Sequence, residues 1–269
     1  MTPPPDDHPA AERNSQNFVN GFARGLAVIE AFADAPDALS LAEVAARAGL
    51  DRAVTRRMLL TLVELGFVIQ TNRRFRLAPR ILRLGYAFLS QASFDGMLRP
   101  FLMELTQKLE ESVSVSVLDG TETVIVCHVT ATMRKAGLLM REGSRWPAYA
   151  TASGRVLLSP LSDEDIRHRL GSGLRPLTRR TLTDPEAILR AIRTAEASGY
   201  ALLDEELEDG LASASVPIFD RRGKLVASLN ASSAKVRRSP HNLRTAVVPL
   251  LQQVSAEVGK LIPDGMLAG

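Results

Sequence analysis

The chain has 269 residues, of which 45% are hydrophobic and 23% are charged, and its formal net charge is only +3. These proportions are typical of a folded, water-soluble protein and exclude a disordered or fibrous chain. The single cysteine, Cys127, excludes an intrachain disulfide framework and fits a reducing compartment. No apolar run reaches the roughly 18 residues that a membrane-spanning helix needs. The composition therefore predicts a soluble cytoplasmic protein with no membrane partner and with one large or two smaller domains.

The first 17 residues, MTPPPDDHPAAERNSQN, are rich in proline and acidic residues and contain no apolar stretch. They resemble neither a signal peptide nor a membrane anchor, so we expect residues 1–17 to be a disordered tail. Apolar side chains at helical spacing follow at Leu26, Ile29 and Phe32. They predict that residues 22–32 form the first helix of a small domain.

The next stretch, residues 41–77, has the order helix, tight turn, helix and two short strands. Gly49 suits the turn, where the backbone can need a positive φ. Asp51 is placed to cap the second helix, which runs to Leu65, because its carboxylate can accept backbone N–H bonds. Two short apolar segments then flank a basic turn. This order predicts a helix-turn-helix followed by a two-stranded wing.

The second helix of this motif predicts which surface binds DNA. At about 100° per residue, Arg52 and Arg56 share one face of its N-terminal half, which suits insertion of that end into a major groove. Arginine there can pair with guanine or with phosphate. The opposite face, which we expect to be core, is formed by Val54, Met58, Thr61, Leu62 and Leu65. The predicted DNA contacts are Arg52, Thr55, Arg56 and Arg57 on this helix and Arg73, Arg74 and Arg76 in the wing.

Basic charge is concentrated in the same region. Between Arg47 and Arg83 there are nine arginines and only two acidic residues, so this segment carries +7, whereas the whole chain carries +3. Such a local excess is expected of a surface that binds nucleic acid. A few arginines alone would favour an ordinary solvated helix face. The complete helix-turn-helix and wing make double-stranded DNA the stronger hypothesis for the partner.

Pro79 is well placed to start another helix, and Ile81, Leu84, Phe88 and Leu89 give that helix an apolar face. This face fits equally a contact with a second copy of the chain and a contact with the chain's own second domain. The predicted domain boundaries are 18–78 for the DNA-binding domain, 79–93 for the linker helix, 94–262 for the second domain and 263–269 for a C-terminal tail.

The second domain mixes helices and strands. Helices are predicted over 97–109, 151–159, 163–170, 184–197 and 240–262, and strands over 113–118, 124–129, 200–203, 211–216 and 225–231, with 137–140 as a further candidate strand. Asp119-Gly120 and Asp220–Gly223 are turn signals between neighbouring strands. The sequence therefore predicts an α+β protein. An N-terminal winged helix-turn-helix is joined by a linker helix to a mixed α/β domain with a central antiparallel sheet.

Two features of the second domain predict a binding pocket. Ser228, Asn230 and Ser232 share one face of a strand at period two, and buried polar groups need partners. The segment Thr151–Gly154 leads into a helix start, where free N–H groups favour an anion. Donors, small residues and a helix N-terminus together suit a small carboxylate. The alternative is that these serines and the asparagine only satisfy the local backbone.

An enzyme is the main alternative from another class. The chain contains no G-x-S-x-G, Walker or G-x-G-x-x-G motif, and its four histidines show no metal-ligand spacing. The acidic run at residues 205–209 is expected to be a solvated edge. We therefore expect no catalytic residue, metal or cofactor, and a hydrolase using the α/β domain is the weakest alternative. A ligand-independent architectural DNA-binding protein is another, against which the large second domain argues.

Several long segments, in this order, resemble the IclR-type transcriptional regulators. Within that family they resemble the branch that regulates protocatechuate and 4-hydroxybenzoate breakdown in the β-ketoadipate pathway. The resemblance covers about residues 18–262. The segments are FVNGFARGLAVIEAF (18–32), RAVTRRMLLTLVELGFV (52–68), FRLAPRILRLGYAFLS (75–90), VLDG (117–120), RWPAYATASGRVLLS (145–159), GYALLDEELEDGLAS (199–213) and VASLNAS (226–232).

The resemblance implies an effector-responsive regulator of aromatic-acid catabolism genes. It implies a homodimer or dimer of dimers on a palindromic operator, with a small organic acid as the effector. The predicted effector contacts are Thr151, Ala152 and Ser153 at the helix start, Leu211 and Ser213 on one strand, and Asn230 and Ser232 on the next. Arg145 and Arg134 lie nearby in sequence as candidate counter-charges for the acid.

Two positions depart from the pattern of this branch. Trp146 stands where the branch usually has leucine before Pro-Ala, and Ala212 stands where arginine is expected. Ala212 alternates with Leu211 and Ser213 along the strand, so we expect it to face away from the effector. These departures bear on which acid is recognised.

Overall fold

The computed structural model describes residues 18–33, 35, 37–84, 94–131, 140–171 and 173–262. Contacts within the chain divide it into two compact units, residues 1–88 and 89–269. The division falls inside the predicted linker of residues 79–93. Pro79–Ile81 form a 3₁₀ turn and residues 82–84 are helical, whereas the rest of the predicted linker, including Phe88, lies outside the described residues. So do the predicted tails and most of the candidate strand at 137–140.

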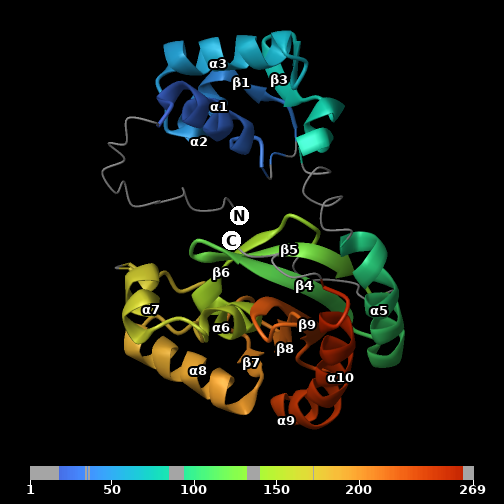
Figure 1. Cartoon of the computed structure of the whole chain (residues 1–269). Helices are drawn as coiled ribbons and strands as arrows, with labels where there is room; N and C mark the ends of the chain where they lie inside the picture. Colours follow the sequence, from blue (N-terminus) through green and yellow to red (C-terminus); the bar gives the residue numbers. More distant parts are fainter. Residues whose placement is uncertain are drawn as a thin grey trace. The chain divides into compact units, whose positions relative to one another are not determined.

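In the first unit, the described residues up to 78 form the helices α1 to α3 and a small antiparallel sheet (Figure 1). The helices are α1 (Asn20–Glu30), α2 (Leu41–Ala48) and α3 (Arg52–Glu64), and the strands are β1 (Leu39–Ser40), β2 (Val68–Thr71) and β3 (Arg74–Leu77). The sheet order is β1-β3-β2, with the β2–β3 hairpin as the wing. The predicted winged helix-turn-helix is therefore confirmed, and β1 adds a short third strand that the sequence did not indicate.

Local sequence explains why the helices of this unit begin and end where they do. Ser40 and Glu43 form a reciprocal capping box at the start of α2. Gly49 ends α2 in the left-handed conformation, with φ of 64°. Asp51 Oδ1 accepts a hydrogen bond of 2.8 Å from the Val54 N–H and so caps α3. The predicted turn glycine and helix cap are thus confirmed.

The predicted core face of α3 was rotated from the observed one. The fully buried side chains are Thr55 and Leu59, with Leu62 only 7% exposed, whereas Leu65 is 51% exposed and Thr61 is also exposed. Thr55 can be buried because its hydroxyl donates to the Asp51 carbonyl over 2.9 Å. The apolar residues of α3 surround much of the helix, so periodicity alone did not select the face that packs on α1 and α2.

The second unit is built on a six-stranded antiparallel sheet with the order β6-β5-β4-β9-β8-β7. The strands are β4 (Ser112–Asp119), β5 (Glu122–Val129), β6 (Arg145–Pro147), β7 (Ala201–Asp204), β8 (Leu211–Phe219) and β9 (Leu225–Ala234). The helices are α5 (Phe94–Leu109), α6 (Ala152–Leu158), α7 (Asp163–Leu170), α8 (Pro185–Ser198), α9 (Pro240–Asn242) and α10 (Val248–Gly259), with a 3₁₀ turn η2 at Ala148–Ala150. The predicted central antiparallel sheet is confirmed.

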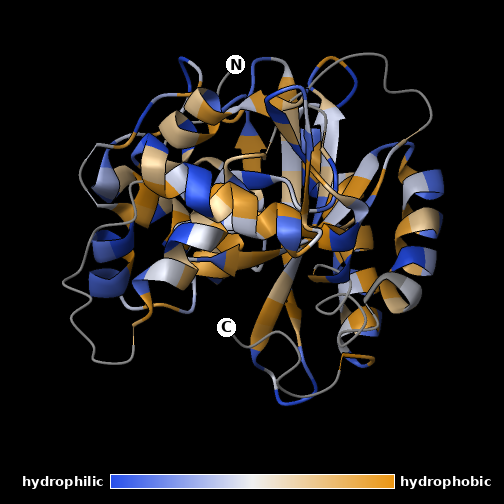
Figure 2. Ribbon diagram, turned by 90° about the horizontal axis from the view of Figure 1, so that it is seen from above, coloured by the Kyte–Doolittle hydropathy of each residue, from blue (hydrophilic) through white to orange (hydrophobic). Residues whose placement is uncertain are grey.

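The two faces of this sheet differ in polarity. One face carries apolar side chains and packs on α5 and α10, which lie side by side in Figure 1. The other face carries serines and an asparagine and is covered mainly by α6. Ala212 belongs to the apolar face, as its alternation with Leu211 and Ser213 predicted. Figure 2 shows orange and blue residues alternating along the helices, as expected of helices with one apolar and one polar face.

The C-terminal helix differs from its prediction in having a break. Residues Leu243–Val247 form a π-helical turn between α9 and α10. Pro249 has no N–H to donate to the carbonyl four residues earlier, so the regular helical pattern is interrupted just before it. None of the described helices combines the length and apolar character needed to cross a bilayer.

Candidate functional site

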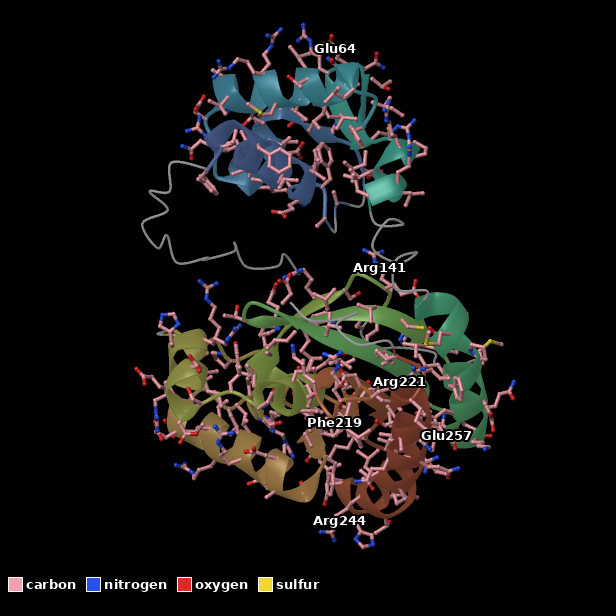
Figure 3. The ribbon with its side chains drawn as sticks, in the orientation of Figure 1. Glu64, Arg141, Phe219, Arg221, Arg244 and Glu257 are labelled. Carbon is pink, nitrogen blue, oxygen red and sulfur yellow. The ribbon has the colours of Figure 1, made fainter. Side chains whose placement is uncertain are left out.

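The exposed face of α3 carries the predicted DNA-contacting arginines. Arg52, Arg56 and Arg57 are all exposed, and several nitrogen-tipped (blue) side chains project outward around this helix in Figure 3, where Glu64 marks its C-terminal end. Arg57 therefore lies on the solvent side of α3, together with Arg52 and Arg56. The face presents positive charge from the first turn of the helix onward, as insertion into a DNA groove requires.

The wing places Arg73 at its tip. Asn72 and Arg73 connect β2 and β3 with φ angles of 48° and 65°, the left-handed pair of a two-residue hairpin turn. Arg76 is exposed on β3. Arg74 is engaged within the unit, because one of its terminal nitrogens donates to the Ala38 carbonyl over 2.7 Å. Arg74 therefore holds β3 in place as well as adding charge.

The structure narrows the predicted set of DNA contacts. Thr55 is fully buried, so its side chain cannot reach DNA without unfolding α3, and this prediction is corrected. Two other arginines of the basic segment have internal roles: Arg47 donates to the Ala31 and Ala33 carbonyls, and Arg80 stacks over the Phe67 ring. Of the predicted DNA contacts, five are exposed and form no ion pair with another described residue: Arg52, Arg56, Arg57, Arg73 and Arg76.

The second candidate site is a cavity between α6 and the polar face of the six-stranded sheet. All seven predicted effector residues line it: Thr151, Ala152, Ser153, Leu211, Ser213, Asn230 and Ser232. The remaining lining residues are Ser114, Ser116, Thr123, Ile125, Met140, Trp146, Leu203 and Leu207. The structure thus brings three separate segments of the sequence to one place. The cavity volume is about 30 Å³, room for about two water molecules.

The start of α6 is held tightly against the residues that precede it. Thr151 Oγ1 accepts from the Gly154 N–H over 2.9 Å and so caps the helix. A side chain at Gly154 would lie 2.0 Å from the Ala148 carbonyl oxygen, so only glycine permits this approach. The N–H groups of Ala152 and Ser153 precede the first intrahelical hydrogen bond, and both residues line the cavity. They can donate to an anion inside the cavity.

The opposite wall carries a short chain of polar groups. Asn230 Nδ2 donates to Ser232 Oγ over 3.0 Å, and Ser232 Oγ donates to Met140 Sδ over 3.8 Å. A thioether sulfur is a weak acceptor, so an oxygen of a bound molecule would be a better partner for the Ser232 hydroxyl. Asn230 and Ser232 are 7% and 5% exposed. These polar groups are buried but keep hydrogen-bonding capacity that a ligand can use.

No charged side chain lines the cavity among the described residues. Arg145, a predicted counter-charge, is exposed and bound to Glu122 and Asp119 over 2.7 and 2.8 Å. Burial lowers the pKa of Arg145, and these two hydrogen bonds raise it, so that the net shift is upward. The positive charge of Arg145 is therefore balanced by Glu122 and Asp119 and not by a ligand in the cavity. The prediction for Arg145 is therefore corrected. Arg134 lies outside the described residues.

The acidic run at residues 205–209 was expected to be a solvated edge; Asp209 is exposed, but Glu206 is buried. Glu206 is 9% exposed and accepts a 2.5 Å hydrogen bond from Arg155 on α6, which is 5% exposed. Glu206 also accepts from the Leu182 N–H over 3.2 Å. Glu205 is paired with Lys235. The buried ion pair ties α6 to the segment after β7, and no local sequence signal links residues 51 positions apart.

Sequence reasoning also missed the part that Trp146 plays in the cavity wall. Its indole lines the cavity from β6, a strand too short to be recognised by alternation. The described residues contain no group of three or more histidine, cysteine, aspartate or glutamate side chains placed to hold a metal ion.

The fold and the two sites define a class of protein: a DNA-binding regulator whose second domain encloses a polar ligand cavity. Comparison with protein families supports this class. The IclR helix-turn-helix domain matches residues 22–71, and the C-terminal domain of the bacterial transcriptional regulator IclR matches residues 87–262. The chain belongs to the IclR family of transcriptional regulators. Its relatives are regulators and not enzymes, in agreement with the sequence prediction.

Three known proteins illustrate the relationship. The Pca regulon regulatory protein of Pseudomonas putida is 34% identical over 96% of this chain and 90% of its own length. A putative transcriptional regulator from Rhodococcus sp. RHA1 is 40% identical, with a TM-score of 0.75 over 90% of this chain and 97% of that one. The inducer-binding domain of a PobR double mutant from Acinetobacter, solved with 3-hydroxybenzoic acid, is 33% identical, with a TM-score of 0.58 over 61% of this chain and 97% of its own.

Proposed function

We propose that the protein regulates genes of aromatic-acid breakdown by binding a palindromic operator in response to a small carboxylate effector. The effector is an aromatic acid such as protocatechuate or 4-hydroxybenzoate, or a pathway product such as β-ketoadipate. The protein acts in the cytoplasm as a homodimer or a dimer of dimers. The names of its relatives support this assignment, because the P. putida protein is named for the pca regulon and the PobR domain was solved with a hydroxybenzoic acid.

One observation carries the effector proposal: three segments far apart in sequence line a single polar cavity beside a helix start. A carboxylate there receives hydrogen bonds from the N–H groups of Ala152 and Ser153, where the local dipole also favours an anion. The other polar end of the effector meets Asn230 and Ser232. Since the described lining has no cationic side chain, such donors must replace the water that a carboxylate loses on burial.

Asn230→Ala should weaken binding of 4-hydroxybenzoate about five- to a hundredfold, because it leaves the buried hydroxyl end of the effector without its partner, which costs about 1–3 kcal/mol. The affinity for operator DNA without effector should stay unchanged. Ser228→Ala is the matched control: Ser228 lies on the same strand and face but bonds the Ser116 carbonyl and does not line the cavity. Titration calorimetry measures both.

The same titrations test the charge of the effector. 4-Hydroxybenzamide has the shape of the acid but no negative charge, so it should bind much more weakly than 4-hydroxybenzoate. Equal binding of acid and amide would show that the carboxylate is not recognised in this cavity. An unchanged affinity in Asn230→Ala would show that Asn230 does not bind the effector.

Arg56→Ala should weaken binding to the operator by about 1–3 kcal/mol and affect random DNA much less, since a base contact adds only to specific binding. Arg73→Ala at the wing tip should weaken both and reduce the salt slope by about one, as expected for a phosphate contact. Arg24→Ala is the matched control, because Arg24 is exposed on α1 of the same unit, outside the motif. The operator is first selected from random DNA, and binding is measured at several salt concentrations.

Equal losses of Arg56→Ala on operator and random DNA would assign Arg56 to phosphate alone. The selected site should be a palindrome if the protein binds as a dimer. Exposed apolar side chains in the first unit support self-association: Phe22 and Leu26 on α1 are 69% and 41% exposed, and Leu82 and Leu84 are 71% and 52% exposed. Apolar surface of this kind is commonly covered by a second subunit.

A further inference from the structure

The indole of Trp146 carries a hydrogen-bond donor that is enclosed and unused. Its Nε1 atom is buried and has no acceptor among the described residues, although the ring lines the cavity. The backbone of Trp146 is fixed, since β6 pairs it with Thr123 and Thr123 Oγ1 donates to the Trp146 carbonyl over 3.3 Å. The ring is therefore held at the cavity by a strand whose own hydrogen bonds are made.

An indole N–H can only donate, so it cannot be satisfied by another donor. Buried polar groups in native proteins are paired in the great majority of cases, and an exception needs an explanation. Since no described residue accepts a hydrogen bond from Trp146 Nε1, a molecule bound in the cavity that Trp146 lines would supply the missing acceptor.

The position of Trp146 in the chain indicates which group of the effector accepts this hydrogen bond. Trp146 lies only five residues before Thr151, and the segment between them leads through the η2 turn directly into the start of α6. The indole donor and the first N–H groups of α6 therefore come from one continuous segment of the cavity wall. A carboxylate has two oxygens and about four acceptor positions, so it can accept from both at once. Such a donor also offsets the lack of a cation in the described lining.

We propose that Trp146 Nε1–H donates a hydrogen bond to the carboxylate of the effector and selects for acids at this site. This inference rests on the proposed effector function. It adds a specificity-determining residue that contributes through its N–H group, beyond the packing area of its ring.

Trp146→Phe keeps an aromatic ring and removes the donor. It should weaken both 4-hydroxybenzoate and benzoate by at least tenfold, because both carry the carboxylate. Weaker binding of 4-hydroxybenzoate alone would show that the indole N–H bonds the ring hydroxyl, and this would overturn the proposal. Unchanged affinity for both acids would overturn it as well. Tyr149→Phe is the matched control: its hydroxyl donates to the Arg175 carbonyl over 2.8 Å, away from the cavity, and its loss should leave both affinities unchanged.

A spectroscopic measurement on the unmodified full chain does not depend on how the variant folds. Trp146 is the only tryptophan, so the protein gives one indole N–H signal in a ¹H–¹⁵N spectrum. Addition of 4-hydroxybenzoate should move the indole proton downfield, as formation of a hydrogen bond to a carboxylate requires; an unmoved signal at saturation contradicts the proposal. If the wild-type protein binds neither acid, the proposed function fails together with this inference. If it binds both acids, and Asn230→Ala weakens 4-hydroxybenzoate while Trp146→Phe weakens neither acid, only this inference fails.

Discussion

Glu206→Ala should lower the free energy of unfolding of the second unit by about 3–5 kcal/mol, since removal of one partner leaves the other charge buried and uncompensated. Arg155 is 5% exposed, and its Nε atom already has no acceptor among the described residues. Without Glu206 the guanidinium also loses its 2.5 Å partner on the segment after β7. Urea unfolding of the full chain, followed by circular dichroism, measures the change.

Two comparisons separate the buried pair from an ordinary surface pair. Arg155→Leu combined with Glu206→Leu should recover most of the lost stability, because neither charge is then buried. Glu186→Ala, which breaks the exposed Arg167–Glu186 pair of 2.7 Å, should leave the free energy of unfolding almost unchanged, because water screens an exposed pair. A double variant as unstable as Glu206→Ala would show that packing, and not the unpaired charge, causes the loss.

Gly154→Ala should damage the effector cavity severely. The added methyl group would lie 2.0 Å from the Ala148 carbonyl oxygen and 2.4 Å from the Ala148 Cα, and backbone atoms cannot move aside as a flexible side chain can. The start of α6 must therefore shift away from η2. We expect a loss of about 3 kcal/mol in stability, at the upper end for overpacking, together with loss of 4-hydroxybenzoate binding. Thermal unfolding and calorimetry measure the two effects.

Gly96→Ala is the matched control for this substitution. Gly96 is an exposed helical residue of α5, and a side chain there would meet no atom within 4 Å. Because alanine favours helix, this change should stabilise the protein by up to about 1 kcal/mol and leave the cavity intact. Full effector binding by Gly154→Ala would show that α6 tolerates the shift, and the cavity would then not depend on this close approach.

Sequence reasoning succeeded where the chemistry is local. The cap at Asp51, the turn at Gly49 and the alternation of Asn230 and Ser232 with apolar neighbours depend on residues within a few positions of each other. The cavity could be anticipated for the same reason, because a polar strand face and a helix start each left their own pattern. The family resemblance added which segments meet.

The sequence did not predict features that depend on contacts between residues far apart in the chain. Leu59 is buried and Leu65 exposed because α1 and α2 pack on one side of α3, and the helix itself offers apolar residues on both. Glu206 looked solvated until its partner on α6 was known, since a carboxylate is stable inside a protein only beside a group such as Arg155. The role of Trp146 required the position of β6, which has only three residues.

The small volume of the effector cavity has a consequence for affinity. Pockets that enclose drug-sized ligands usually measure about 300–1,000 Å³, whereas this cavity measures about 30 Å³. An aromatic acid must then bind a wider form of the second unit, and its observed dissociation constant is the intrinsic constant divided by the population of that form. If about one molecule in a hundred is open, the observed affinity is about a hundredfold weaker than the contacts alone would give. A substitution remote from the ligand that favours the wider form would therefore make the regulator respond to lower concentrations of the acid.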